Sequence, residues 1–168
     1  MPMNTQSEAI RVVVVDDHPI FREGLAHILE RADGFQLTRA VSSGTEAMDA
    51  LKELSPEVMV LDVGLPDCNG VDLAKSILEA APATKVVMLT MHDEPELFEL
   101  AMDRGLSGYV LKEDAVSNLV NCLETVMAGK KFVSPSLAPL LVQRFEMRKR
   151  LERDRPGLES LSPAERRV

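Results

Sequence analysis

A short stretch near the N-terminus decides the fold: Arg11-Val12-Val13-Val14-Val15-Asp16-Asp17. A continuous β-branched run without polar alternation is typical of a parallel strand that is buried on both faces. Two carboxylates follow the run directly, at the carboxyl end of the predicted strand. In open parallel α/β sheets, ligands bind beyond the carboxyl ends of the strands. The stretch therefore predicts an α/β protein whose chemistry lies along one edge of its sheet.

Strand-like and helix-like segments alternate from this stretch to Gly129. Strands are predicted at residues 11–15, 35–39, 58–61, 85–89 and 108–110, and helices at residues 18–31, 44–54, 71–80, 95–104 and 115–128. The punctuation agrees, because Pro56 follows the second helix, Pro95 opens the fourth and Gly129 ends the fifth. Five such units predict a doubly wound parallel sheet with helices on both faces.

The chain changes character after Gly129. Residues 132–135 are extended in pattern, a helix is predicted from Leu137 to about Arg153, and Pro156-Gly157 ends it. We therefore expect a flexible N-terminus over 1–9, a compact domain over 10–130, a linker with a helix over 131–157, and a remnant over 158–168 that is too short to fold alone. The linker helix either packs on the compact domain or repacks between partners on dimerisation, and both interpretations stay open.

Composition narrows the possible functions. Of the 168 residues 45% are apolar, which is enough for a core, and the apolar runs are too short to span a bilayer. Residues 1–9 contain no signal-peptide core, and Cys68 and Cys122 do not form a disulfide framework. We therefore expect reduced thiols in a cytoplasmic protein with no membrane partner.

The charge is unevenly distributed along the chain. Residues 143–168 contain eight basic and five acidic residues, a net charge of +3. Because the whole chain has a net charge of −8, residues 1–142 carry −11. A domain this acidic repels nucleic acid, so DNA is not expected to bind to it.

Polar groups end four of the five predicted strands. Asp16-Asp17 follow the first, Asp62 the third, Thr90 the fourth and Lys112 the fifth. Three carboxylates in one cleft repel each other unless a cation is present, and oxygen ligands of this kind suit Mg²⁺. Lysine neutralises further charge, and a threonine hydroxyl donates to an incoming oxyanion. This set of groups predicts phosphoryl transfer onto a carboxylate.

Four motifs at these strand ends resemble one known family. They are Val15-Asp16-Asp17-His18-Pro19-Ile20-Phe21-Arg22-Glu23-Gly24-Leu25, the D-x-x-[LM]-P-x-x-x-G loop Asp62-Val63-Gly64-Leu65-Pro66-Asp67-Cys68-Asn69-Gly70, Thr90 after a hydrophobic strand, and Gly108-Tyr109-Val110-Leu111-Lys112. In this order, they resemble the receiver domain of two-component response regulators of the NarL/FixJ subgroup, over about residues 11–129. The resemblance implies a flavodoxin-like sheet of five strands in the order 2-1-3-4-5, followed by a linker helix.

The resemblance also implies a chemistry. Asp62 would accept a phosphoryl group from a phosphohistidine of a sensor histidine kinase. Asp16, Asp17, Asp62 and the backbone carbonyl of Gly64 would hold Mg²⁺, or Mn²⁺ in its place. The protein would be a signalling switch that catalyses only its own phosphorylation and dephosphorylation, and would not be a metabolic enzyme.

Three further residues would respond to phosphorylation of Asp62. Lys112 would pair with a phosphoryl oxygen, Thr90 would hydrogen-bond to another, and Tyr109 would move inward into the space that Thr90 leaves. The resemblance further implies that Gly64 and His92 occupy positions that influence how water reaches the phosphoryl group. Because glycine leaves that approach open, we expect a short-lived phosphorylated form.

The C-terminal residues resemble the start of a LuxR-type helix-turn-helix domain. Leu161-Ser162-Pro163-Ala164-Glu165-Arg166-Arg167-Val168 is similar to L-[ST]-x-R-E-x-x-V, with Ala164 at the usual arginine. The resemblance implies that DNA binds only through an output domain missing from this sequence. It also implies a homodimer on phosphorylation, through the first and fifth helices or through the fourth helix, fifth strand and fifth helix.

Other interpretations explain single motifs. Asp16-Asp17 alone fits a helix cap, and His18 and His27 are expected to be surface or helix-packing residues. A phosphatase of the haloacid-dehalogenase type needs a second aspartate at the position of Gly64, and a P-loop nucleotide hydrolase needs a glycine-rich lysine motif that the sequence lacks. A flavin binder of the same fold and an interaction protein that sequesters phosphoryl groups are the remaining alternatives.

Overall fold

The computed structural model describes residues 8–91 and 93–154. Its elements, in chain order, are β1 (Ile10–Val15), α1 (Pro19–Arg31), β2 (Phe35–Val41), α2 (Gly44–Leu54), β3 (Val58–Asp62), α3 (Gly70–Ala80), β4 (Lys85–Thr90), α4 (Pro95–Asp103), β5 (Gly108–Leu111), the short 3₁₀ helix η1 (Lys112–Asp114), α5 (Ala115–Met127), β6 (Phe132–Val133), the 3₁₀ helix η2 (Pro135–Leu137) and α6 (Ala138–Asp154). Each strand and helix predicted within 11–128 is present, with its ends shifted by at most two residues.

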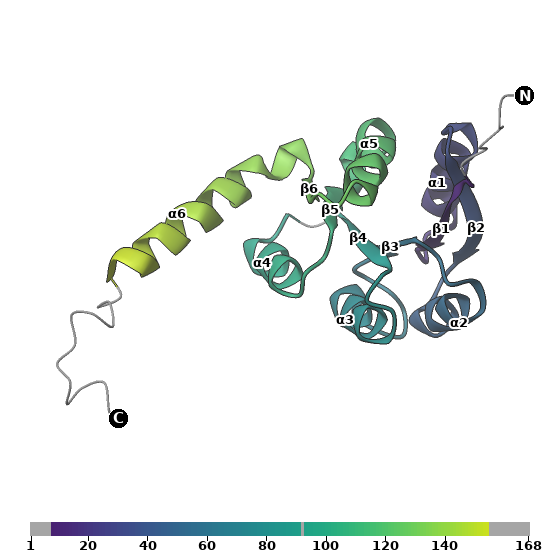
Figure 1. The fold of residues 1–168 in the computed structure, drawn as a ribbon, viewed down its shortest axis with the longest axis horizontal. Helices are drawn as coiled ribbons and strands as arrows, with labels where there is room; N and C mark the ends of the chain where they lie inside the picture. The colour runs from purple at the N-terminus through teal and green to yellow at the C-terminus, as the bar shows by residue number, and fades with distance from the viewer. Residues whose placement is uncertain (1–7, 92, 155–168) are drawn as a thin grey trace, which may run out of the picture.

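The strands form one parallel sheet in the order β2-β1-β3-β4-β5-β6. Helices α1 and α5 cover one face, and α2, α3 and α4 cover the other (Figure 1). The doubly wound fold and the order 2-1-3-4-5 are confirmed. The predicted number of five strands is wrong, because Phe132 and Val133 pair with Gly108 and Tyr109 and extend the sheet beyond β5.

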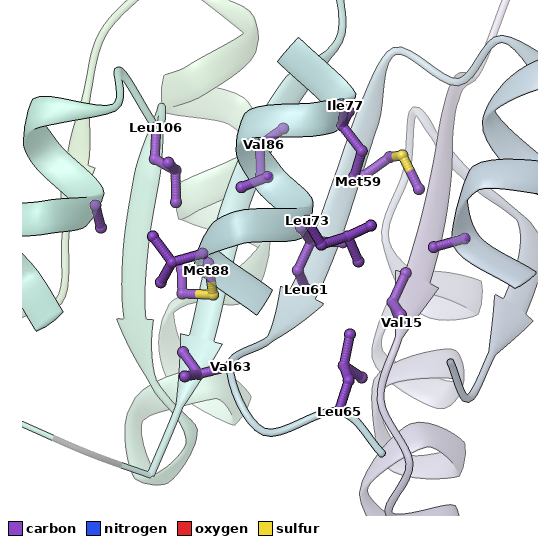
Figure 2. Close-up of a cluster of buried hydrophobic side chains, with 14 of the residues drawn as sticks. Val15, Met59, Leu61, Val63, Leu65, Leu73, Ile77, Val86, Met88 and Leu106 are labelled. Atoms are coloured by element: carbon purple, nitrogen blue, oxygen red, sulfur yellow. The ribbon is translucent and has the colours of Figure 1, made fainter. Parts of the chain in front are cut away.

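The core lies in two layers, one on each face of the sheet. Val13 and Val15 join the layer beneath α2, α3 and α4, while Val12 and Val14 join the layer beneath α1 and α5. Successive side chains of a strand point to opposite faces, so burial on both sides explains the unbroken valine run. Figure 2 shows the first layer, where side chains from β3 and β4 meet those of α3; Leu61, Met88, Leu73 and Ile77 are among the labelled residues.

Helix α6 is attached to the domain at its start and then leaves it (Figure 1). Leu137, just before the helix, is buried in the core, and Leu140 packs against the same layer. Arg144 binds two acids of α4, Glu99 and, at 2.8 Å, Asp103. Further along, apolar side chains are exposed at Phe145, Met147 and Leu151. The linker helix therefore packs on the domain through its first turns only.

None of the helices within the described ranges is both long enough and apolar enough to cross a membrane. The two cysteines are free thiols, Cys122 buried on the core side of α5 and Cys68 partly exposed in the loop before α3. Burial raises the pKa of the Cys122 thiol to about 12. The pKa of the Cys68 thiol is also raised, first by burial and then by the Asp67 carboxylate.

Candidate functional site

The carboxyl ends of the central strands bring the predicted residues together. Asp16 follows β1, Asp62 is the last residue of β3, and Lys112 follows β5. The Nζ atom of Lys112 lies 2.8 Å from Oδ2 of Asp16 and 3.1 Å from Oδ2 of Asp62. A parallel sheet with β1, β3 and β5 near its centre thus produces an ionic cluster from residues almost a hundred positions apart.

The three groups of this cluster are removed from water. The side chains of Asp16, Asp62 and Lys112 are 1%, 6% and 7% exposed. Burial raises the pKa of Asp62, and the neighbouring Asp16 carboxylate raises it further, while Lys112 and the Gly64 amide oppose the shift. Because a buried carboxylate is stable only with compensation, Lys112 is the group that favours the charged, nucleophilic form of Asp62.

Two carboxylate oxygens at the site remain available to a cation. Within the described residues, the buried atoms Oδ2 of Asp16 and Oδ1 of Asp17 make no hydrogen bond. Oδ2 of Asp16 lies 2.8 Å from the Lys112 ammonium, in an ion pair without hydrogen-bond geometry. Ligand atoms of Asp16, Asp17, His18 and Asp62 all lie within 4.8 Å of one another. The carboxylate oxygens of this set fit a hard divalent cation.

His18 belongs to the cluster, which the sequence interpretation missed. Its side chain is 56% exposed, as expected of a surface residue, but Nδ1 lies 3.0 Å from Asp16 Oδ1 and 3.2 Å from Asp17 Oδ1. The same atom is 3.5 Å from Asp62 Oδ2 and 3.2 Å from Lys112 Nζ. Its position next to Asp16-Asp17 was the only signal in the sequence. His27, in contrast, lies on the exposed surface of α1 as predicted, 77% exposed.

Thr90 and Tyr109 form a buried pair beside the cluster. Both side chains are fully buried, and they are hydrogen-bonded to each other. The Tyr109 ring meets Phe98 of α4 edge-on, with centroids 5.4 Å apart and planes at 82°. Burial, with Glu94 and Asp93 nearby, raises the pKa of Tyr109 to about 12. The described position of Tyr109 is thus the inward one, against α4. His92 lies outside the described residues.

The backbone of the loop after Asp62 packs very closely against the start of α3. The Gly64 amide donates to Oδ1 of Asp62 at 3.4 Å, and the Gly70 amide donates to the carbonyl of Val63 at 2.8 Å. A Cβ atom at Gly70 would collide with the carbonyl oxygen of Asp62 and would lie 2.8 Å from Val63 Cα. Glycine is therefore required where α3 begins, because the backbone of the Asp62 loop occupies the space of a side chain.

Asp67 fastens the tip of the same loop to α2. Its carboxylate accepts hydrogen bonds from the amides of Gly44 and Thr45, at 2.8 and 3.0 Å, and from the Thr45 hydroxyl at 3.0 Å. These bonds lower the pKa of Asp67 to about 2. The charged carboxylate sits at the N-terminus of a helix, where the helix dipole also favours it. The loop that carries Asp62 is thus anchored at both α2 and α3.

A groove of about 920 Å³ opens next to the cluster, between α1 and the segment from β5 to α5. Lys112 and Thr90 are among its lining residues, and its apolar side chains include Ile20, Met91 and Val116, which are 87%, 73% and 78% exposed. The ammonium of Lys112 also lies 4.6 Å from the centre of the Phe21 ring, a cation–π contact.

Comparison with protein families identifies the family to which this site belongs. The family model described as "Response regulator receiver domain" matches residues 12–124. The chain belongs to the response regulator receiver family. This receiver family is a signalling family, and the resemblance inferred from the four motifs is confirmed.

The relatives of this receiver are response regulators of the NarL and LuxR type. It is 32% identical over 143 residues to the transcriptional regulatory protein LnrK of Bacillus subtilis (strain 168), covering 85% of this chain and 65% of LnrK. It is 32% identical over 145 residues to the probable transcriptional regulatory protein NarL of Mycobacterium tuberculosis (strain ATCC 25618 / H37Rv), covering 86% of this chain and 67% of that protein. The chain thus spans about two thirds of the length of these relatives.

Solved structures agree with the fold of this receiver. A two-component response regulator of the LuxR family from Aurantimonas sp. SI85-9A1 superposes with a TM-score of 0.77 at 31% identity, over 82% of this chain and 98% of that one. The isolated receiver domain of RcsB from Salmonella enterica serovar Typhimurium, in the presence of phosphomimetic BeF₃⁻, superposes with a TM-score of 0.75 at 28% identity, over 79% and 99%.

Proposed function

We propose that this receiver accepts a phosphoryl group from a sensor histidine kinase on Asp62, in a reaction that requires Mg²⁺ or Mn²⁺. The observation that carries the proposal is the position of Asp62, buried at the end of β3 against both Asp16 and Lys112. The switch catalyses its own phosphorylation and dephosphorylation, and it has no metabolic substrate.

In the proposed reaction, an Oδ atom of Asp62 attacks the phosphorus of the phosphohistidine. The P–O bond to Asp62 forms as the P–N bond breaks, and the imidazole of the kinase leaves with the electron pair of that bond. Lys112 keeps Asp62 ionised before the attack and pairs with a phosphoryl oxygen afterwards. Asp16, Asp17, Asp62 and the carbonyl of Gly64 would hold the metal ion, which supplies positive charge to the phosphoryl oxygens.

The buried pair of Thr90 and Tyr109 responds to the new charge on Asp62. A phosphoryl oxygen at Asp62 would compete with Tyr109 for the hydrogen bond of the Thr90 hydroxyl, so Thr90 would move toward Asp62, and the Tyr109 ring, which already lies inward against α4, would follow into the space that Thr90 leaves. Because the Tyr109 ring packs on Phe98, its movement acts on α4. We infer that the face made by α4, β5 and α5 is where phosphorylation changes the surface.

The proposed partners follow from the same geometry. The kinase must place its phosphohistidine at Asp62, and the groove beside Lys112, with exposed Ile20 and Val116 on its rim, gives it an apolar surface next to the cluster. We also propose dimerisation on phosphorylation and a cytoplasmic location. Transcriptional control would act through a DNA-binding domain outside this sequence, since relatives such as LnrK are named transcriptional regulatory proteins.

The lifetime of the phosphorylated form depends on access of water. Gly64 is exposed and has open space where a side chain would begin. We therefore propose that Gly64, together with His92, leaves the phosphoryl group open to hydrolysis and makes the phosphorylated state short-lived. A half-life of many hours would contradict this part of the proposal.

The test is intact mass after incubation with Mg²⁺ and acetyl phosphate. The parent protein should gain one phosphoryl group, and chelation of the metal should prevent the gain. Asp62→Asn should gain none, while Asp49→Asn, which removes an exposed carboxylate of α2, should behave like the parent. A folded parent protein that stays unmodified would refute phosphorylation by small donors and would favour a receiver that works through protein binding alone.

A further inference from the structure

We propose that His18 is an additional ligand of the cation site, so that this receiver binds nitrogen-preferring transition-metal ions more tightly than an all-oxygen site does. The proposal rests on the proposed function, because it concerns the same cation site. It adds a nitrogen donor to the carboxylates and the carbonyl already assigned there.

The distances at His18 suit metal coordination. Two neighbouring ligands of an octahedral ion with bonds of about 2.1 Å lie about 3 Å apart. Nδ1 of His18 lies 3.0 Å from a carboxylate oxygen of Asp16, 3.2 Å from one of Asp17 and 3.5 Å from one of Asp62. An ion placed among these oxygens would therefore have Nδ1 at the spacing of an adjacent ligand, with little movement of the ring.

The backbone of His18 is held in this place. His18 precedes Pro19, the first residue of α1, and its amide donates to Oδ1 of Asp16 at 2.8 Å. Arg22 holds the same turn, because its guanidinium donates to the carbonyl of Asp16 at 2.7 Å. The backbone of His18 and the Asp16 carboxylate are thus parts of one tight turn, and the ring of His18 extends from this turn to Asp16 and Asp17, at 3.0 and 3.2 Å.

Charge at the site leaves room for a dication. When ionised, Asp16, Asp17 and Asp62 carry three negative charges against the single positive charge of Lys112, so a net charge of about −2 remains to be neutralised. Lys112 contacts Nδ1 of His18 at 3.2 Å, and an incoming ion would displace that contact. The Phe21 ring, 4.6 Å from the ammonium, gives Lys112 a second favourable neighbour.

The chemical consequence is a changed preference among metal ions. Carboxylate and carbonyl oxygens suit Mg²⁺ and Mn²⁺, whereas imidazole nitrogen suits Ni²⁺, Cu²⁺ and Zn²⁺. Loss of the imidazole should therefore weaken Ni²⁺ binding much more than Mg²⁺ binding. We expect a loss of at least about tenfold for Ni²⁺, since even removal of an outer partner of a metal ligand costs that much.

The direct test is pulsed EPR on tag-free protein loaded with Mn²⁺. A nitrogen bonded to Mn²⁺ gives a hyperfine coupling that changes when the histidines carry ¹⁵N. The coupling should appear in the parent protein and in His27→Gln and should disappear in His18→Gln. The chain has three histidines, so the double variant His27→Gln/His92→Gln retains His18 alone and should keep the coupling even if His18→Gln does not fold.

Equilibrium dialysis with Mg²⁺, Mn²⁺ and Ni²⁺ provides the second readout. The ratio of Ni²⁺ to Mg²⁺ affinity should fall at least about tenfold in His18→Gln and stay unchanged in His27→Gln. Mn²⁺ that binds to the parent without a histidine coupling, or an unchanged ratio in His18→Gln, would overturn the role of His18 and leave the proposed function standing. A parent that binds none of the three ions would overturn both.

Discussion

The tightest contact at the site predicts a large effect of a single methyl group. In Gly70→Ala, the new Cβ would collide with the carbonyl oxygen of Asp62 and would lie 2.8 Å from Val63 Cα and 2.9 Å from the carbonyl carbon of Asp62. Ordinary contacts of a Cβ atom begin at 3.4 Å. The start of α3 and the Asp62 loop must therefore separate, and all of the obstructing atoms belong to the backbone, which cannot rotate away.

The cost follows from two effects. Overpacking of this kind costs about 1–3 kcal/mol, and separation also stretches the hydrogen bond from the Gly70 amide to Val63, 2.8 Å long, which is worth about 1 kcal/mol. We expect the free energy of unfolding of Gly70→Ala to fall by about 2–4 kcal/mol. The matched control is Gly24→Ala within α1, where a Cβ meets nothing within 4 Å. That substitution should stabilise the protein by about 0.5–1 kcal/mol.

Urea unfolding followed by far-UV circular dichroism measures both variants, since the chain contains no tryptophan and only one tyrosine. Under conditions where Gly70→Ala is still folded, it should also be phosphorylated by acetyl phosphate more slowly than Gly24→Ala, because Asp62 is displaced. A Gly70→Ala protein as stable as the parent would refute the reasoning, since it would show that the Asp62 loop can open without cost.

Three other outcomes can be measured on the same protein. Arg144→Gln should release α6 from α4 and speed hydrogen exchange there, at a cost of only about 0.5–1 kcal/mol because the two acids of α4 are partly solvated, 42% and 61% exposed; unchanged exchange would contradict the attachment. Asp67→Asn should have a lower free energy of unfolding than the parent near neutral pH. This difference should vanish as the pH falls from about 4 to about 2, because folding lowers the pKa of Asp67 from 3.8 to about 2. Thiol reagents at mildly alkaline pH should modify Cys68 slowly and Cys122 only on unfolding, since burial raises the pKa of both thiols and Cys122 is wholly enclosed; rapid labelling of Cys122 in the folded protein would contradict its burial.

The convergence of Asp16, Asp62 and Lys112 could be predicted from the sequence for a topological reason. Parallel strands end at the same edge of a sheet, so each residue that follows a strand is placed without knowledge of side-chain packing. The strand order, in contrast, was predicted only through the family resemblance. The helices were predicted from local signals, namely their apolar periodicity and their prolines.

Features that depend on side-chain direction or on close contact could not be predicted in this way. The imidazole of His18 reaches the carboxylates because a turn orients it, and that turn is fixed by the Asp16 carboxylate itself. Strand β6 has only two residues, and they become a strand because β5 offers an open edge. The position of the Lys112 ammonium against Phe21 is a further contact of this kind, since no spacing in the sequence relates the two residues.

Helix α6 acts mechanically as a lever. Its 17 residues extend about 25 Å, and the domain holds it only near Leu137, Leu140 and Arg144. A tilt of about 10° at this base would carry the far end about 4 Å, roughly three quarters of the rise of one helical turn. Small movements of α4, which holds Arg144, would thereby be amplified at the end of α6. A slight repacking around Phe98 would then produce a displacement large enough to make or break a contact elsewhere.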